Sequence, residues 1–358
     1  MQTQKIQLIE CSGTSCEIGR QYGEAAKDNI LKSLDFMLDS LRRGPFKIQS
    51  DEVMKASGRY IANAKSFDCE AIEWIRGIAQ GAGISFEESF ALKTCFEITA
   101  AYPGISGTGM CTSFALGQEV CRHDIAMLGQ NIDWHPEVPV DILHIHRADG
   151  LDQFVICLSA NCLYYMNSAG ICNCANLVLS PMGPVISHVP LTIYLWKAMR
   201  CRTLGETMDV LKHSARGISY YHVGDCHGNF VGIESVYDDY ALLAPDGGVL
   251  VHANHYETEK YRKNDLAPLY IPDSFRRAER MRQLVADSYG DITAEYMMDV
   301  LSDHHDDPDS ICSHGNPAKP AEMVSVTRAS FIMIPSELKI YVAYGPPCTS
   351  KYYEYSLK

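Results

Sequence analysis

The chain changes character near residue 105, and this change limits the folds open to it more than any other feature. Before that point apolar residues recur at helical spacing, and after it short runs of strand-forming residues alternate with glycine, asparagine and aspartate. Residues 70–84 and 85–99 are predicted helices, with Gly81 and Gly83 as the stop between them. An earlier helical stripe follows a capping-box pattern from Thr14 to Glu17 and contains Ile18, Tyr22, Ala26, Ile30, Leu34 and Leu38.

The remaining two thirds of the chain mix strands with helices. Helices are predicted over 190–214, 274–289 and 293–305. Strands are predicted over 111–117, 124–134, 141–148, 153–160, 164–173, 220–236, 240–248, 249–256, 327–336 and 338–345. This order favours an α+β fold in which antiparallel sheets pack between helical layers. Because neither a low-complexity linker nor a fixed-period repeat interrupts the 358 residues, we expect a single domain over 1–358.

Charge and hydropathy exclude several classes of partner. The formal net charge is -13, and no block of lysine and arginine breaks this acidic balance, so nucleic acid is not an expected partner. No stretch approaches the length of apolar residues that crosses a bilayer, and the first residues do not form a secretory signal. We therefore expect a cytoplasmic protein without a membrane partner.

The cysteines and histidines suggest no metal site. The 14 cysteines are scattered without a CxxC pair, so most are expected to be reduced and buried. His304, His305 and His314 surround an acidic loop, but their spacing matches no recognised ligand pattern. We expect no metal and no other cofactor, and a metal-dependent hydrolase built on 304–314 is the least favoured alternative.

Familiar enzyme motifs are missing. The sequence contains no GxGxxG that opens a helix after a strand, no GxxxxGK[ST], no HExxH and no GxSxG. Gly19 and Gly23 lie four residues apart inside the first helical stripe, a spacing that favours close helix packing over phosphate binding.

Cys111 lies where the helical third gives way to the strands, at the start of a predicted strand. A buried core cysteine is the simplest interpretation of such a residue. If the Met110–Cys111 bond were cut, however, Cys111 would carry both a thiol and a free α-amine with a pKa of roughly 7.7–8.0. One residue would then supply nucleophile and base for attack on an amide or thioester carbonyl.

The chain resembles the acyl-coenzyme A:6-aminopenicillanic-acid (isopenicillin N) acyltransferase family of autoprocessing N-terminal-nucleophile hydrolases. Each shared sequence motif is weak evidence alone, but nine motifs occur in the family's order over nearly the whole length of the chain. They are GTSCEIGRQYGEAAK, EWIRGIAQGAG, CTSFALG, GQNIDW, NSAGIC, VHANHY, PDSFRRAERM, DSIC and TRASFIMI. The resemblance implies a four-layer αββα sandwich, cleaved between Met110 and Cys111 into an α fragment 1–110 and a β fragment 111–358 that stay associated.

The resemblance also implies roles for individual residues. Cys111 matches the nucleophile, Asp133 the acidic residue beside its amine, and Asn254 the asparagine whose amide helps to form the oxyanion hole. Arg328, preceded by Thr327, resembles a Ser-Arg pair near the site, and Asn131 is a second polar candidate for substrate binding. In Met110 the chain departs from the penicillin acyltransferase, which has glycine before its nucleophile. His252 and His255 are left out, because the amine already supplies a base.

Each assignment has a structural alternative. Asp133 fits a turn after a strand, Asn254 fits left-handed geometry at a hairpin end, and Arg328 fits a surface ion pair. For function, we favour hydrolysis of the amide bond in small N-acyl compounds through an acyl-thioester on Cys111. The alternatives are acyl-coenzyme A-dependent N-acyl transfer, and an unprocessed relative without catalytic activity. A small N-acyl amide or acyl thioester is the expected partner.

Overall fold

The computed structural model describes residues 8–100, 110–181, 188–212, 219–236 and 239–357. Its first part is helical, as the periodicity predicts. A single strand, β1 (Leu8–Gly13), precedes seven helices: α1 (Ser15–Ala25), α2 (Lys27–Arg43), α3 (Ser50–Gly58), α4 (Ile61–Phe67), α5 (Cys69–Ala82), α6 (Phe86–Lys93) and α7 (Cys95–Ala100). The predicted capping box begins α1, where Thr14 and Glu17 exchange hydrogen bonds with each other's backbone N–H. Gly83, at φ 72°, ends α5 in the left-handed conformation.

Helices α1 and α5 pack with their backbones in direct contact. A Cβ atom on Gly19 would lie 2.1 Å from the carbonyl oxygen of Trp74, and one on Gly77 would lie 2.1 Å from that of Cys16. Gly23 and Gly81 face the opposite helix in the same way. The prediction that the glycines of α1 serve helix packing is therefore confirmed, since no larger side chain fits between these backbones.

Two sheets form the centre of the molecule. The eight-stranded sheet has the order β1-β4-β5-β6-β7-β8-β9-β10, and the six-stranded sheet has the order β11-β2-β3-β12-β13-β14. All neighbours pair antiparallel except β1 and β4, which are parallel. The strands after β1 are β2 (Met110–Leu116), β3 (Met127–Trp134), β4 (Val140–Arg147), β5 (Asp152–Leu158), β6 (Asn161–Asn167), β7 (Cys172–Asn176), β8 (Ser219–Gly224), β9 (Phe230–Val236), β10 (Asp239–Leu243), β11 (Val249–His252), β12 (Val326–Ile334), β13 (Lys339–Tyr344) and β14 (Tyr352–Ser356).

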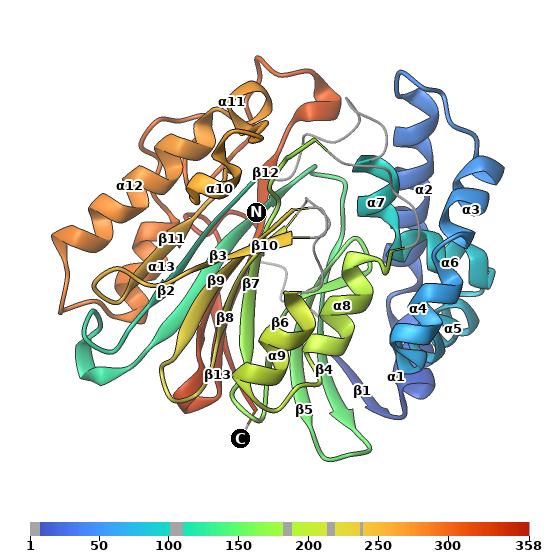
Figure 1. Cartoon of the computed structure of the whole chain (residues 1–358), viewed down its shortest axis with the longest axis horizontal. Coiled ribbons are helices and arrows are strands. Elements are labelled where there is room, and N and C mark those ends of the chain that lie inside the picture. The colour runs from blue at the N-terminus through green and yellow to red at the C-terminus, as the bar shows by residue number, and fades with distance from the viewer. Residues whose placement is uncertain (1–7, 101–109, 182–187, 213–218, 237–238, 358) are drawn as a thin grey trace.

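Helices cover both outer faces of the paired sheets, which gives the predicted αββα sandwich of class α+β (Figure 1). The eight-stranded sheet contacts α1, α8 (Leu191–Ala198) and α9 (Leu204–Leu211), and the six-stranded sheet contacts α12 (Asp273–Asp287) and α13 (Ala294–Leu301). Two short helices, α10 (Glu259–Arg262) and α11 (Ala267–Tyr270), precede α12. One apolar core spans the N-terminal helices and the space between the sheets, and a second lies under α12 and α13.

The structure differs from the sequence interpretation in several elements, and two of the differences have local causes. The helical segment predicted over 190–214 is two helices, because Thr203 caps α9 with its side chain and interrupts the path from α8. The edge strands β1 and β14 were not predicted. Strand β14 is half exposed along its length, so it lacks the apolar run that marks a buried strand.

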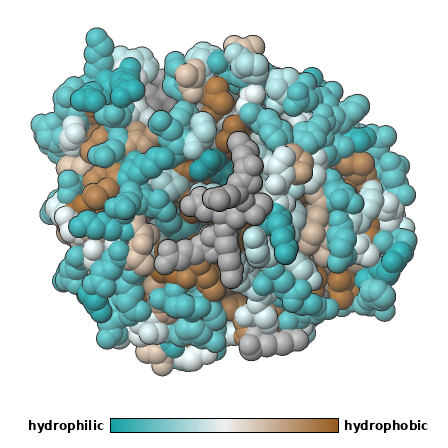
Figure 2. All heavy atoms as spheres, turned by 180° about the vertical axis from the view of Figure 1, so that it is seen from behind, coloured by the Kyte–Doolittle hydropathy of each residue, from teal (hydrophilic) through white to brown (hydrophobic). Residues whose placement is uncertain are grey.

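One face of the molecule is mostly polar. Figure 2 shows a face on which hydrophilic side chains predominate and hydrophobic ones lie scattered or in small groups. Within the described ranges, no helix has both the length and the apolar character needed to cross a bilayer.

Candidate active site

Cys111 is the second residue of β2, inside the six-stranded sheet between β11 and β3. Its side chain is 2% exposed and lies beside the hydroxyl of Tyr164 on β6, a residue that the sequence did not single out. Burial, and then the nearby Asp133 carboxyl, raise the pKa of the Cys111 thiol to about 12. Hydrogen bonds from the Asp133 backbone and Tyr164, with the charge of Arg277, oppose this rise. In the uncut chain the sulfur is therefore a protonated thiol that needs a base.

The Met110–Cys111 peptide bond is held by Asn254, just after the end of β11. The N–H of Cys111 donates to Asn254 Oδ1 over 2.8 Å, and Asn254 Nδ2 donates to the carbonyl oxygen of Leu177 over 2.8 Å. The backbone N–H of Asn254 donates to Ser274 Oγ over 2.6 Å. Asn254 thus contacts the bond predicted for cleavage. In the uncut chain its side-chain oxygen accepts from the Cys111 N–H, and its side-chain nitrogen donates to Leu177 and not to the Met110 carbonyl.

Arg277, from α12, connects these groups and was missed by the sequence interpretation. Its Nη1 donates to the carbonyl oxygen of Cys111 over 2.8 Å and to Thr112 Oγ1 over 2.7 Å, while Nη2 donates to Asn254 Oδ1 over 2.9 Å. Its Nε pairs with Asp273 over 2.9 Å, and both side chains are buried. The signal available in the sequence was the spacing of four between Asp273 and Arg277, which places both on one helix face.

Asp133 lies on β3 opposite Met110, fully buried. Its Oδ1 accepts a hydrogen bond of 2.6 Å from Thr327 Oγ1, whereas its buried Oδ2 has no hydrogen-bond partner among the residues that the structure describes. Burial raises the pKa of this carboxyl to about 7, against the opposing charge of Arg277 and the Thr327 hydrogen bond. Since opposite residues of an antiparallel pair share a face, the carboxylate lies on the helix-covered face with Met110, and the Cys111 side chain faces the other sheet.

The other predicted residues lie around this centre with different contacts. Thr327 positions Asp133 and also exchanges backbone and side-chain hydrogen bonds with Ser313. Asn131 Nδ2 donates to the carbonyl oxygens of Leu301 and Ile311, each over 2.8 Å, which anchors the end of α13.

The side chain of Arg328 contacts other residues than that of its neighbour Thr327. Its Nε donates to the carbonyl oxygen of Val138 over 3.2 Å, and its guanidinium lies 6.0 Å from the ring centre of Tyr344. Arg277, and not Arg328, is therefore the arginine that contacts the Cys111 backbone, and the role that the resemblance implies for Arg328 stays a prediction.

His252 and His255 contact residues that lie next to Asn254 and not Cys111 itself. His252 Nε2 lies 3.4 Å from Glu234, and its ring stacks on Tyr220 at 3.5 Å. His255 Nδ1 lies 2.7 Å from Ser274 Oγ, the atom that accepts from the Asn254 backbone. Both histidines thus belong to the scaffold behind Asn254.

Met110 fills an apolar pocket beside Cys111. Its side chain is buried in a cluster with Leu179 and Ile271, against which Leu177 and Leu266 pack. Apolar side chains therefore surround Met110, which supplies the carbonyl of the Met110–Cys111 bond.

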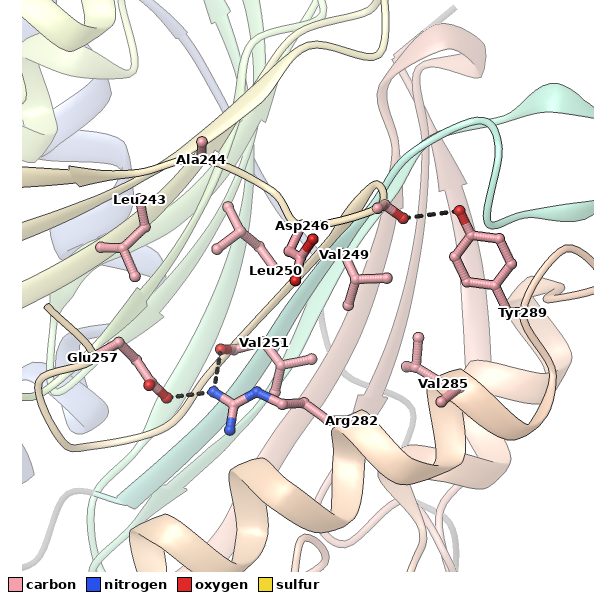
Figure 3. A pocket seen from close by; sticks show the side chains of 12 residues that line it. Leu243, Ala244, Asp246, Val249, Leu250, Val251, Glu257, Arg282, Val285 and Tyr289 are labelled. Atoms are coloured by element: carbon pink, nitrogen blue, oxygen red, sulfur yellow. Dashed lines mark hydrogen bonds and ion pairs between the residues drawn. The ribbon is translucent and has the colours of Figure 1, made fainter.

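A shallow surface cavity of about 420 Å³ lies apart from this centre, between β11 and α12 (Figure 3). Arg282 crosses its floor, pairing with Glu257 and donating to the carbonyl oxygen of Val251. At the far end, Tyr289 donates to the carbonyl oxygen of Gly247 over 3.0 Å. The lining contains none of Cys111, Asp133, Asn254 and Arg277, so this cavity is separate from the candidate site.

Comparison with known proteins gives one family match. A family model described as acyl-coenzyme A:6-aminopenicillanic acid acyl-transferase matches residues 120–345, a range that contains Asp133, Asn254, Arg277 and Arg328 and begins after Cys111. The chain is 28% identical over 313 residues to the acyl-coenzyme A:6-aminopenicillanic-acid-acyltransferase 40 kDa form of Emericella nidulans, covering 85% of this chain and 84% of that protein.

Similar solved structures are more distant in sequence. A conjugated bile acid hydrolase from Clostridium perfringens has 11% identity and a TM-score of 0.44, covering 69% of this chain and 97% of that one. Penicillin V acylase from Agrobacterium tumefaciens has 12% identity and a TM-score of 0.47, covering 69% of this chain and 86% of that one.

Proposed function

Since the chain belongs to the acyl-coenzyme A:6-aminopenicillanic acid acyl-transferase family, we propose that it is a self-processing cysteine enzyme that cleaves the amide bond of small N-acyl compounds. The observation that carries this proposal is the set of contacts on the backbone of Cys111. Asn254 accepts from the N–H of Cys111, in the bond predicted for cleavage, and Arg277 donates to the Cys111 carbonyl, in the next peptide bond. Beside Met110, a buried carboxyl oxygen of Asp133 has no hydrogen-bond partner among the described residues.

Maturation begins with the Cys111 thiol. The sulfur attacks the Met110 carbonyl carbon, a C–S bond forms, and the C–N bond to Cys111 breaks as the thiol proton passes to the leaving nitrogen. Asn254 Oδ1 holds that nitrogen throughout, because it already accepts from its N–H. Water then hydrolyses the thioester, which leaves a carboxylate on Met110 and frees the thiol beside a new α-amine.

In turnover, the new α-amine of Cys111 acts as the base. Its reference pKa of roughly 7.7–8.0 leaves a neutral form available near neutral pH, and this form accepts the thiol proton as the sulfur attacks. Once protonated, the ammonium keeps Asn254 Oδ1 as an acceptor, and Asp133, whose Oδ2 has no hydrogen-bond partner among the described residues, is the nearby carboxyl that can pair with its charge. An adjacent ammonium favours the ionised carboxylate and so lowers the raised pKa of Asp133. Asn254 Nδ2, on release from Leu177, is the side-chain donor for the oxyanion.

The two fragments remain together after cleavage. Strand β1 and helices α1–α7 belong to the fragment 1–110, yet β1 pairs with β4 along its whole length. The helices share the main apolar core with both sheets. Cleavage at Met110 therefore cuts one peptide bond and leaves this packing intact.

Met110 indicates the kind of acyl group that the site accepts. During maturation Met110 is itself the acyl group transferred to the sulfur, so a substrate's acyl group occupies the same side of Cys111. The surrounding Leu179, Ile271, Leu177 and Leu266 favour an apolar acyl chain of a few carbons over a charged one.

Transfer of the acyl group to an amine is the second candidate function. The name of the Emericella nidulans relative favours acyl transfer, since it describes an acyl-coenzyme A:6-aminopenicillanic-acid acyltransferase. The chemistry on Cys111 is the same in both cases, and the outcome depends on whether water or an amine reaches the thioester.

Intact mass under denaturing conditions tests the nucleophile. Freshly purified wild type should give two fragments of roughly 12 and 28 kDa, scaled from 39.9 kDa, whereas Cys111→Ala should stay whole. Cys174→Ala is the matched control, because Cys174 is another buried strand cysteine and should not affect cleavage. An uncut wild type, or cleavage in Cys111→Ala, would refute the proposal.

A second assay separates hydrolysis from transfer. The processed enzyme is given a panel of N-acyl amides, and separately acyl-coenzyme A with an amine acceptor. Release of acid from short apolar N-acyl amides supports hydrolysis. If acyl groups leave only acyl-coenzyme A and appear only on the amine, the transferase is the correct function.

A further inference from the structure

Four cysteine and histidine side chains from three separated segments meet near one end of the six-stranded sheet. His304 follows α13, Cys312 and His314 lie in the segment that leads to β12, and Cys348 lies between β13 and β14. Their ligand atoms all lie within 4.8 Å of one another. We propose that these four side chains bind a structural zinc ion.

The distances within the cluster fit a tetrahedral site. Zinc–sulfur bonds of about 2.3 Å and zinc–nitrogen bonds of about 2.0–2.1 Å place two sulfurs about 3.8 Å apart, two nitrogens about 3.4 Å apart, and a sulfur and a nitrogen about 3.6 Å apart. The two sulfurs, of Cys312 and Cys348, are 3.6 Å apart, and the Nε2 atoms of His304 and His314 are 3.0 Å apart. His314 Nε2 lies 3.8 Å from Cys312 Sγ and 3.1 Å from Cys348 Sγ. Small adjustments of exposed side chains bring all four within bonding distance of one ion.

The donor set selects zinc among the common cations. Two thiolates and two imidazoles form a closed tetrahedral shell, which is the arrangement of structural zinc sites, whereas calcium and magnesium prefer oxygen ligands. Two thiolates also neutralise the charge of a divalent ion. Cys312 is buried and anchors the cluster, while His304, His314 and Cys348 are exposed, which leaves a path for the ion to enter.

The ion would cross-link segments that lie far apart along the chain. It ties the stretch after α13 to the turn before β14, two regions separated along the chain by β12 and β13. Ser313 lies between two of the ligands, and its N–H donates to Thr327 Oγ1, which in turn donates to Asp133. The zinc site therefore supports the strand segment that holds the buried carboxyl.

The proposal replaces the expectation, drawn from sequence spacing, that the chain binds no metal. His304 and His314 were noticed, but Cys348 lies 34 residues after His314 and no motif connects them. The turn between β13 and β14 supplies the fourth ligand.

Metal analysis of the full-length chain tests the site. The protein is purified under reducing conditions without a histidine tag, and its zinc content is measured after dialysis. Wild type should hold about one zinc per chain, and His304→Ala or Cys348→Ser should lose it, with zinc affinity weakened about tenfold or more. The matched controls are His305→Ala and Cys69→Ser, which remove an adjacent exposed histidine and another exposed cysteine outside the cluster. Both controls should keep the ion.

Cobalt provides a readout that needs no variant. Co²⁺ added to reduced, metal-free wild type should give the visible absorption of a tetrahedral ion together with a thiolate-to-cobalt band in the near ultraviolet, and zinc should abolish both. A strong chelator should lower the melting temperature of wild type and both controls but leave the two site variants unchanged.

Three results would overturn the proposal. The first is a reduced wild type that takes up neither zinc nor cobalt. The second is a thiol count that shows a Cys312–Cys348 disulfide in the freshly purified, metal-free chain and no metal uptake after reduction. The third is zinc that binds equally well to wild type, His304→Ala and Cys348→Ser.

Discussion

Replacement of Arg277 separates its role in the fold from its role at Cys111. Arg277→Met removes a buried guanidinium and leaves the Asp273 carboxylate buried, with Lys319 Nζ at 4.0 Å as the one ion-pair partner left to it among the described residues. Breaking a buried pair in this way costs about 3–5 kcal/mol, because one charge stays in the interior without its partner. We expect the free energy of unfolding to fall by about 3–4 kcal/mol, the weak contact with Lys319 offsetting part of the loss.

The double variant Asp273→Asn/Arg277→Met removes both charges. Its loss of stability should be only about 1–2 kcal/mol, which reflects the hydrogen bonds to Cys111 and Asn254 and no longer a buried charge. Self-cleavage should nevertheless slow about a hundredfold or more in both variants, because the Cys111 carbonyl and Asn254 Oδ1 both lose the guanidinium that links them.

Two assays measure these effects independently. Urea unfolding is followed in the Cys111→Ala background, so that every sample is a single uncut chain. Cleavage is followed in the Cys111 background by intact mass during incubation. If the double variant regains stability and also cleaves at the wild-type rate, Arg277 serves only its ion pair and its proposed role at the site is wrong. Equal instability of the single and double variants would refute the buried-charge argument.

Three further predictions concern other parts of the structure. Asp133→Asn should stabilise the uncut Cys111→Ala chain increasingly as pH rises from about 4 to about 7, because the carboxyl is then ionised in the unfolded chain but still protonated in the folded chain, where its pKa is about 7; urea midpoints at each pH measure this. Asn131→Ala should lower the free energy of unfolding by about 2–4 kcal/mol in urea titrations, because two buried carbonyls lose their donor. Gly19→Ala should cost about 3 kcal/mol by thermal melting, because its Cβ meets a backbone oxygen of α5 at 2.1 Å.

Each of these predictions has a contrasting outcome. The sign for Asp133 follows from its raised pKa: the protonated form is favoured in the folded chain, so stability is lost as pH rises towards 7, and a pH-independent difference would contradict the assignment. Asn131→Ala should leave cleavage of the folded chain unchanged, whereas a cleavage defect would favour the substrate-binding role. Gly205→Ala is the control for Gly19, because a Cβ there meets open space in α9 and should be neutral or stabilising by up to about 1 kcal/mol.

The arrangement of layers was predictable because it depends on periodicity. The apolar stripe from Ile18 to Leu38, the capping box at Thr14 and the short strands after Cys111 each report local geometry that the backbone then adopts. Edge strands were harder, since β14 has no fully buried residue on either face and carries little periodic signal. The placement of Cys111 and Asp133 on neighbouring strands was also implied, because a hairpin joins β2 to β3.

The contacts at the candidate site depend on packing between distant elements. Asn254 meets Cys111 across 143 residues and Arg277 meets it across 166, and only the position of α12 over the six-stranded sheet brings the guanidinium to the β2 backbone. Arg328 shows the opposite case, since its neighbour Thr327 reaches Asp133 while its own side chain turns to Val138.

The helical first third, the class of the fold and the close packing of α1 through its glycines could be predicted from the sequence, and Cys111 was proposed as the nucleophile from its position and the family resemblance. Helices, strands and glycine contacts depend on residue types and spacings of a few positions, which act through the local backbone. The packed fold was needed to show which arginine contacts the Cys111 backbone, that one buried oxygen of Asp133 has no hydrogen-bond partner among the described residues, and that Cys348 joins the cluster of His304, Cys312 and His314. Those outcomes depend on how separate elements pack against one another, and the direction and burial of a side chain between them are not encoded in its immediate neighbours.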